Sequence, residues 1–278
     1  MAAETVRKEA ALRRSAEHEL RVHQYLLQYY ESMFPWLEEF RGEEVDELIT
    51  STAAEAVAEE SPTEPSDPAR RRLTDAEYRQ LTDCEKYQLA LDRYWSERKT
   101  RWEVGRDYER YVGYLYETDG YAVHYQGIVE GFADLGRDLV CQRGSELVVV
   151  QCKRWSREKT IHEKHVFQLH GTVMACQLDH PECKARGVLV TSTVLSKRAH
   201  KFAALLDIQV HEDLPLIRYP CVKCNVSRSD GSKVYHLPFD QQYDRTIVEE
   251  HRCERYVETV AEAERLGFRR ALRWRGST

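Results

Sequence analysis

The sequence lacks any run of about eighteen apolar residues, so no transmembrane helix is expected. Its first residues, MAAETVRKEA, lack the apolar core of a secretory signal peptide. We therefore expect a cytoplasmic protein with no membrane partner. Eight cysteines are present, but a chain of 278 residues can bury a sizeable core and does not need disulfides. Free thiols or metal ligation are expected instead.

The chain also lacks an overall positive charge. Its net charge is -6 at pH 7, and an even distribution of that charge would argue against a polyanionic partner. The acidic residues are concentrated in residues 36–68, which hold eleven Asp or Glu and one Arg and leave about +4 on the rest. Basic clusters at residues 153–159, 197–201 and 269–275 could contact phosphates, although such clusters are more often solvated surface.

The first third of the chain reads as helices around a linker. Residues 1–50 are predicted to be helical, because Leu20, Leu27 and Phe34 recur every seven residues on a charged background. Such helices can bind a partner protein or dock on their own domain. Residues 51–73, rich in Ala, Glu, Pro and Ser, are typical of a flexible acidic linker.

Residues 74–105 are predicted to form a helical connector. Thr74-Asp-Ala-Glu77 and Thr82-Asp-Cys-Glu85 both have the Thr-x-x-Glu pattern of a capping box at a helix start. Gly105 is expected to break this connector from the next helix.

From residue 106 to residue 218 the pattern alternates between helices and strands. The order helix, three strands, helix, strand, helix, strand predicts an α/β core with a mixed sheet, whose later strands are parallel and joined by right-handed crossovers. The helices are expected at residues 106–118, 163–176 and 196–205, and the strands at residues 121–126, 138–142, 146–153, 187–191 and 208–211.

The second and third of these strands are predicted to form a hairpin. With Arg143 and Gly144 as the central turn residues, Asp138 falls opposite Val149. Side chains alternate between the two faces of a strand, and a single bulge would change the face on which a residue lies. Without a bulge, one face carries Asp138, Gln151 and Lys153.

These three side chains suit a metal-dependent phosphodiester hydrolase. Asp138 offers the hard oxygen ligand that Mg²⁺ prefers, and Gln151 offers a weaker, neutral oxygen. Lys153 can orient the attacking water or stabilise the pentacovalent phosphate. The alternative is that they are only a turn cap, a locally satisfied amide and a lysine whose stem packs on the surface.

Five segments favour the enzymatic reading. They are Gly136-Arg-Asp-Leu139, Val149-Val-Gln-Cys-Lys-Arg-Trp155, Val166-Phe-Gln-Leu-His-Gly171, Val188-Leu-Val-Thr-Ser192 and Ala199 to Ala204. In this order they resemble Mrr-type restriction endonucleases of the PD-(D/E)xK nuclease superfamily, from about Tyr108 to Leu216. The resemblance implies the restriction-endonuclease-like αβββαβ fold and an Mg-dependent endonuclease acting on DNA in restriction or anti-phage defence.

The resemblance also implies roles for particular residues. Asp138 and Gln151 would bind Mg²⁺ or Mn²⁺, and Lys153 would be the catalytic lysine. Glu109 would be the acidic residue of the first core helix, and Gln168 would face the active site from the helix after the catalytic strand. Members of this group often carry glutamine in place of the second acidic residue.

The sequence departs from the superfamily pattern in one place, and other functions stay open. Arg137 precedes Asp138 where a proline is common, and Asp134 is a rival ligand. A homo-oligomer, most simply a symmetric dimer, is expected, because one chain carries one site and DNA has two strands. The alternatives are an inactive nucleic-acid-binding module or a helical adaptor that retains the nuclease fold.

Residues 219–278 are predicted to form a small α+β module. Cys221-Val-Lys-Cys224 has the spacing at which two thiolates can bind one Zn²⁺, and His236 is a candidate third ligand. Two stretches, one at residues 234–238 and one at residues 259–269, faintly resemble the Ada-type metal-binding module, but Asp240 stands where that module has a cysteine. The alternative is that both cysteines are small buried residues.

Overall fold

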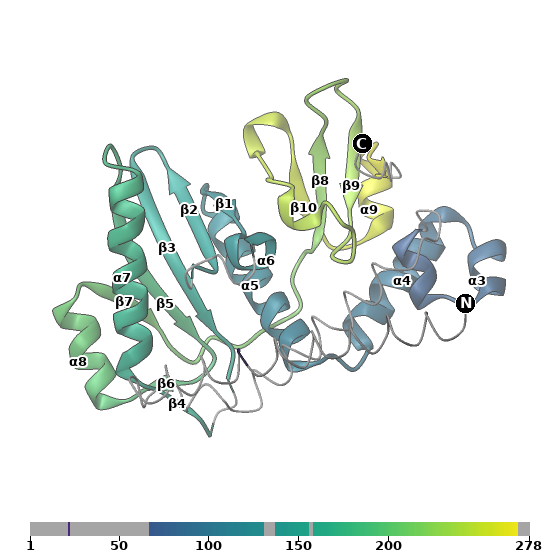
Figure 1. The fold of residues 1–278 in the computed structure, drawn as a ribbon. Helices are drawn as coiled ribbons and strands as arrows, with labels where there is room; N and C mark the ends of the chain where they lie inside the picture. The colour runs from purple at the N-terminus through teal and green to yellow at the C-terminus, as the bar shows by residue number, and fades with distance from the viewer. Residues whose placement is uncertain (1–21, 23–66, 131–136, 156–157, 272–278) are drawn as a thin grey trace, which may run out of the picture. The chain divides into compact units, whose positions relative to one another are not determined.

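The structure is a computed structural model that describes residues 67–130, 137–155 and 158–271, together with Val22 (Figure 1). The described elements belong to one compact unit, Thr63–Thr278. The helical region predicted at residues 1–50 and most of the predicted acidic linker lie outside the described residues. Among the described residues, no helix is long and apolar enough to cross a membrane.

A mixed five-stranded sheet lies at the centre of the first half of this unit, in the strand order β1-β2-β3-β5-β7. The pairs β1–β2 and β2–β3 are antiparallel, whereas β3, β5 and β7 are parallel neighbours connected through α7 and α8. The predicted α/β core with parallel later strands is therefore confirmed. Its elements are α5 (Arg101–Thr118), β1 (Ala122–His124), α6 (Gln126–Glu130), β2 (Leu139–Arg143), β3 (Glu146–Lys153), α7 (Glu163–Asp179), β5 (Lys184–Thr191), α8 (Lys197–Leu205) and β7 (Ile208–His211).

The central strand β3 is buried on both faces, as expected for the middle of a sheet covered by helices on each side. Its odd-numbered residues Leu147 and Val149 pack with Val166 and Leu169 of α7 in one cluster. Its even-numbered residues from Val148 to Cys152 pack with the apolar stripe of α5 in another. Strand alternation therefore assigns Gln151 and Lys153 to the α7 face.

The hairpin between β2 and β3 turns one residue later than predicted. Arg143 pairs with Glu146, so Gly144 and Ser145 are the central residues. Gly144 has a φ of +61°, and a positive φ at the first central position is the requirement of a type II′ turn. The register consequently shifts by two residues: Leu139 pairs with Val150, so continuing the register past the start of β2 places Asp138 opposite Gln151 instead of Val149. An even shift preserves the face, so the predicted grouping survives the corrected turn.

The helix starts follow the capping pattern. The capping boxes at Thr74 and Thr82 are both present, at the starts of α3 (Asp75–Gln80) and α4 (Asp83–Ser96). The predicted break at Gly105 is wrong, because α5 begins earlier and continues through this glycine. A third capping box, between Thr100 and Glu103, starts α5 and was overlooked in the sequence.

The predicted linker and connector are part of a second core. Residues 68–72 of the predicted flexible linker form the short helix η2 (Pro68–Arg72), and Ala69 is fully buried. Tyr87 and Leu91 of α4 pack in the same cluster as Val222 and Tyr235. The helices before the nuclease-like core and the strands after it thus form one module. Its sheet has the order β10-β8-β9-β11 and its elements are β8 (Val222–Val226), β9 (Lys233–His236), β10 (Arg255–Val257), α9 (Val260–Arg265) and β11 (Arg269–Arg270).

Buried ion pairs join this module to α5. Arg110 donates to both carboxylate oxygens of Asp244, at 2.7 and 2.6 Å, and Arg106 donates to the same group at 3.0 Å. Farther along α5, Glu117 lies 3.7 Å from the fully buried Lys223. Arg110, Asp244, Glu117 and Lys223 are buried, so separating the module from α5 would leave charges in the interior without their partners.

Candidate active site

The β2–β3 hairpin holds Asp138 against the end of β3. Asp138 lies directly before β2, and its Oδ2 accepts a 2.5 Å hydrogen bond from the backbone N–H of Cys152. Cys152 stands between Gln151 and Lys153 in the chain, so the carboxylate lies beside the backbone that carries both predicted partners. The structure thus places the carboxylate of Asp138 at the strand end that carries Gln151 and Lys153, and the joint role of the three side chains stays a prediction.

The end of β3 is fixed by hydrogen bonds to β5. The carbonyl oxygen of Lys153 accepts from Thr191 Oγ1 at 2.8 Å and from the N–H of Ser192 at 3.2 Å. Trp155, two residues after Lys153, is held by the side chain of Ser192. Ser192 Oγ accepts from the N–H of Trp155 at 3.0 Å and donates to the carbonyl oxygen of Trp155 at 2.9 Å. The half-buried Lys153 side chain therefore extends from a backbone that has little freedom to move.

Gln151 is fully buried on the α7 face of the sheet. Its neighbours on that face of β3 are apolar, and a side-chain amide is rarely placed in such surroundings. A purely structural position here would favour valine or leucine, as at the preceding positions. The role of this amide as a metal ligand stays a prediction.

The charges of three side chains act on the buried thiol of Cys152. Burial first, and then the negative charges of Asp138 and Glu109, raise the pKa of this thiol well above its ordinary value, whereas the charge of Lys153 lowers it. Glu109 extends from α5 and the other two from the hairpin, so residues of separate elements converge on one region. The role of Glu109 at the site stays a prediction, and its charge effect on the Cys152 thiol is the structural observation that bears on it.

A histidine that the sequence gave no reason to select lies beside the same region. His165, in the first turn of α7, is 3% exposed, and its ring packs edge-to-face on Trp155 with centroids 5.1 Å apart. Burial and the nearby charge of Lys153 lower its pKa to about 3. Neither ring nitrogen has a hydrogen-bond partner within the described part of the chain. A buried, neutral imidazole next to Lys153 is an additional candidate for the site.

Gln168 occupies a different position from the other predicted residues. It is exposed on α7, one residue after Phe167, and is not part of the buried cluster around Cys152. Its proposed role at the active site therefore remains a prediction. Asp134, the rival ligand, lies outside the described residues.

The predicted zinc residues do not converge. Cys221 and Cys224 are both buried, and burial raises the pKa of each thiol to about 12. The indole N–H of Trp95 donates to Cys221 Sγ at 3.3 Å. His236 pairs with Lys223 across β8 and β9, which puts it on the opposite face of that sheet from Cys224. Across the described ranges, no group of three or more His, Cys, Asp or Glu side chains could hold a metal ion, so zinc binding remains a prediction without geometric support.

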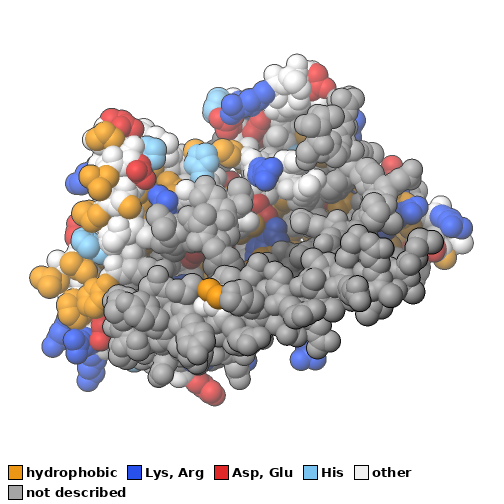
Figure 2. Space-filling view, in the orientation of Figure 1, with side chains coloured by type: hydrophobic (Ala, Val, Ile, Leu, Met, Phe, Trp, Pro, Cys, Tyr) orange, Lys and Arg blue, Asp and Glu red, His pale blue; other side chains and the backbone are white. Residues whose placement is uncertain are grey.

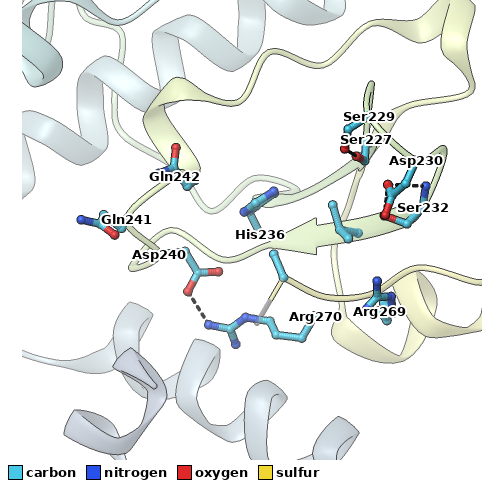
Figure 3. A pocket seen from close by; sticks show the side chains of 12 residues that line it. Ser227, Ser229, Asp230, Ser232, His236, Asp240, Gln241, Gln242, Arg269 and Arg270 are labelled. Atoms are coloured by element: carbon cyan, nitrogen blue, oxygen red, sulfur yellow. Dashed lines mark hydrogen bonds and ion pairs between the residues drawn. The ribbon is translucent and has the colours of Figure 1, made fainter. Parts of the chain in front are cut away.

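A buried ion pair connects two segments of the module at Asp240, the position where the Ada-type module has a cysteine. Asp240 accepts from the N–H of Leu237 at 2.6 Å and forms a close, buried ion pair with Arg270. Both side chains, together with His236, line a polar pocket of about 290 Å³ (Figure 3). The charge pair links β11 to the loop after β9 without a metal.

The segment that contains the β2–β3 hairpin matches the model of a known protein family. Residues 102–213 match the family model Mrr_cat, described as "Restriction endonuclease". The match spans every core element from α5 to β7, and it confirms the resemblance to Mrr-type restriction endonucleases for this part of the chain. The comparison with curated proteins gave no match.

Two solved structures show distant similarity. One is titled "Crystal Structure of Protein of Unknown Function AF1548", with 19% identity, a TM-score of 0.28, and coverage of 38% of this chain and 56% of that one. The other is the MspJI restriction endonuclease in complex with a 27-mer oligonucleotide, with 14% identity, a TM-score of 0.29, and coverage of 55% and 33%. The chain therefore spans about half of the first protein and a third of the second.

Proposed function

Because residues 102–213 carry a restriction endonuclease domain of the Mrr_cat family, we propose that this chain hydrolyses DNA phosphodiester bonds with the help of Mg²⁺ or Mn²⁺, in restriction or anti-phage defence. The observation that carries the proposal is the hydrogen bond between Asp138 and the N–H of Cys152. It keeps a carboxylate beside the strand end that bears Gln151 and Lys153, and phosphodiester hydrolysis needs such a combination of metal ligands and a cationic donor.

Asp138 and Gln151 would hold the metal. One carboxylate and one neutral amide oxygen fit Mg²⁺, which takes few protein oxygens and keeps several waters. When bound, the cation supplies positive charge to the phosphate and acidifies water. Glu109, which approaches the same region from α5, adds a second carboxylate that orients water or strengthens the site.

Lys153 would act on the reacting groups themselves. Its ammonium has three donors, which suit a phosphate oxygen or the attacking water. The hydrogen bonds from Thr191 and Ser192 to the carbonyl oxygen of Lys153 fix the backbone that carries this side chain. Fixed positioning of a reacting group lowers the entropic part of the activation barrier. Gln168, being exposed, would meet the DNA rather than the buried cluster.

The proposal is tested by a cleavage assay on plasmid DNA, methylated and unmethylated, and on RNA, with Mg²⁺, with Mn²⁺ and with EDTA. We expect cutting of DNA that stops when EDTA removes the metal. Lys153→Ala should abolish cutting while thermal unfolding and DNA binding stay close to those of the parent protein. The matched control is Lys184→Ala, because Lys184 is an exposed lysine at the opposite end of the sheet, paired with Glu146.

Each outcome has a definite reading. Equal cutting by parent and Lys153→Ala would refute the assignment of the site. A parent that binds DNA but never cuts it, under any of the metal conditions, would favour the alternative of an inactive nucleic-acid-binding module.

A further inference from the structure

Helix α7 has an apolar stripe on each of two opposite sides. One side packs on the sheet through residues that include Val166, Leu169 and Val173. The other side carries Phe167 and Met174, each 45% exposed, and Leu178, which is 82% exposed. Figure 2 shows hydrophobic side chains gathered along the edge of the molecule that α7 and α8 form in Figure 1. Monomeric proteins rarely leave a continuous apolar stripe of this kind in water.

The outer stripe has the spacing of a helix–helix contact. Together with Gly171, the three exposed residues recur at intervals of four, three and four, the alternation of a coiled-coil heptad. We define the α7 seam as these four residues, Phe167, Gly171, Met174 and Leu178. The ring of Phe202 of α8 packs edge-to-face against that of Phe167, with centroids 4.6 Å apart, at one end of the seam.

Gly171 is not required by the packing of its own chain. No atom lies within 4 Å of the position that a Cβ would occupy there. Glycine in a helix interior costs about 0.5–1 kcal/mol relative to alanine. A glycine kept at an open position in the middle of an apolar seam suits the close approach of another helix.

The seam is complementary to itself when reversed. In an antiparallel pair of α7 helices related by a two-fold axis, Phe167 lies opposite the partner subunit's Leu178, and Gly171 lies opposite the partner subunit's Met174. The open space over Gly171 is thus filled by the long, flexible side chain of the partner subunit's Met174. The two-fold axis makes each of these two contacts occur twice. This self-matching is what an isologous interface requires.

The charges at the two ends of α7 favour the same arrangement. The amino end is net positive, because Lys164, Lys197 and Arg198 outnumber Glu163, which pairs with Arg198 at 3.3 Å. The carboxyl end carries the exposed carboxylates of Asp179 and Glu182 beside two cations, Arg137 at 3.8 Å from Asp179 and the exposed Lys184. An antiparallel pair brings the net positive amino end of each helix to the exposed carboxylates at the carboxyl end of the other, whereas a parallel pair brings two net positive ends together.

We propose that the α7 seam is the two-fold interface through which a second copy of this chain binds, with Met174 of each subunit over Gly171 of the other. The interface stands independently of the proposed nuclease activity. Only its consequence rests on that function: two copies provide two sites, one for each DNA strand.

The test is the oligomeric state of the full chain, measured by analytical ultracentrifugation without DNA or metal. The parent should be a dimer. Leu178→Glu should raise the dissociation constant at least tenfold, whereas Ile217→Glu, at another exposed apolar side chain that is 52% exposed, should not. Gly171→Leu should weaken the dimer similarly, because leucine occupies the space for Met174. At concentrations at which both proteins are monomeric, its thermal unfolding temperature should equal or exceed that of the parent, because leucine favours the helix.

The antiparallel orientation is tested by cross-linking in a Cys253→Ser background, which removes the exposed cysteine. Phe167→Cys and Leu178→Cys proteins should form a disulfide when mixed but not separately, because only unlike positions meet. A monomeric parent, or a dimer that none of the seam variants weakens, would overturn the proposal. Both results leave the nuclease assignment intact, and a dimer that cuts nothing leaves the interface intact.

Discussion

Asp138 has two separable tasks at the residue scale. Its Oδ2 accepts the hydrogen bond from Cys152 and so ties the start of β2 to the end of β3. Under the proposed function, its negative charge also holds the metal. The side chain of asparagine has a carbonyl oxygen that can perform the first task, but it carries no charge for the second.

We therefore predict that Asp138→Asn folds like the parent but loses cleavage by at least about a hundredfold, equivalent to roughly 2.7 kcal/mol in the barrier. Calorimetric titration with Mn²⁺ should show weaker binding in the same variant. Asp75→Asn, at an exposed aspartate in the first turn of α3, is the control and should cut normally. Normal metal binding by Asp138→Asn would contradict the assigned ligand.

His165 gives a pH dependence whose sign follows from its surroundings. Burial and Lys153 lower its pKa to about 3 in the folded protein, compared with about 6.5 in an unfolded chain. The unfolded state therefore takes up the proton first, and the stability due to the neutral imidazole is lost as the pH falls below about 6.5.

The measurement compares urea unfolding of the parent with that of His165→Phe, which keeps an aromatic ring against Trp155. Between pH 7 and pH 5 the parent should lose roughly 2 kcal/mol more than the variant. Carboxylates titrate in the same way in both proteins, so their contribution to the change in the free energy of unfolding cancels in this comparison. An equal loss in the two proteins would show that His165 is already free to protonate in the folded state.

At the scale of elements, local chemistry predicted most of the core. The period of two placed Gln151 and Lys153 on one face, and the Thr-x-x-Glu pattern located the starts of α3 and α4. The turn was misplaced because Gly144 suits either central position of a two-residue loop, and only the observed pairing distinguishes them. His165 could not be selected, since its importance comes from burial beside Lys153 and not from a pattern along α7.

Two glycines should respond in opposite directions to the same substitution. Gly144→Ala should destabilise the protein by about 1 kcal/mol, because alanine is strained at a φ of +61°. Gly105→Ala should stabilise it by roughly 0.5–1 kcal/mol, because this residue lies inside α5 with open space around it. Urea unfolding measures both changes. A gain in stability from Gly144→Ala would contradict the type II′ turn.

At the scale of the whole unit, contacts between distant residues dominate. Arg110 and Asp244 are separated by 134 positions in the sequence, and Lys223 and Glu117 by 106. No local sequence pattern predicts either ion pair. The same is true of the core that Tyr87 of α4 shares with Val222 and Tyr235. The sequence therefore predicted a separate module at residues 219–278, but not that the helices at residues 75–96 complete it.

Removing one partner of the buried Arg110–Asp244 pair should be costly. Asp244→Leu removes the carboxylate that accepts two hydrogen bonds from the buried Arg110, which then keeps, among the described residues, only Asp107 at 3.5 Å and the hydroxyl of Tyr94, and should destabilise the protein by about 3 kcal/mol. The double variant Arg110→Met with Asp244→Leu should recover most of that loss, because it removes both charges. Urea unfolding of the three proteins gives the comparison, and a harmless Asp244→Leu would refute the described junction.

The core shared by α4 and β8 also sets an order of events during synthesis. Helix α4 leaves the ribosome before the nuclease segment, but the strands that cover Tyr87 and Leu91 are made only after it. A chain interrupted between these points exposes apolar surface and remains a target for proteases. Residues 102–213 therefore lie between the two parts of the module, and its core can be completed only in chains that have been translated through β8 and β9.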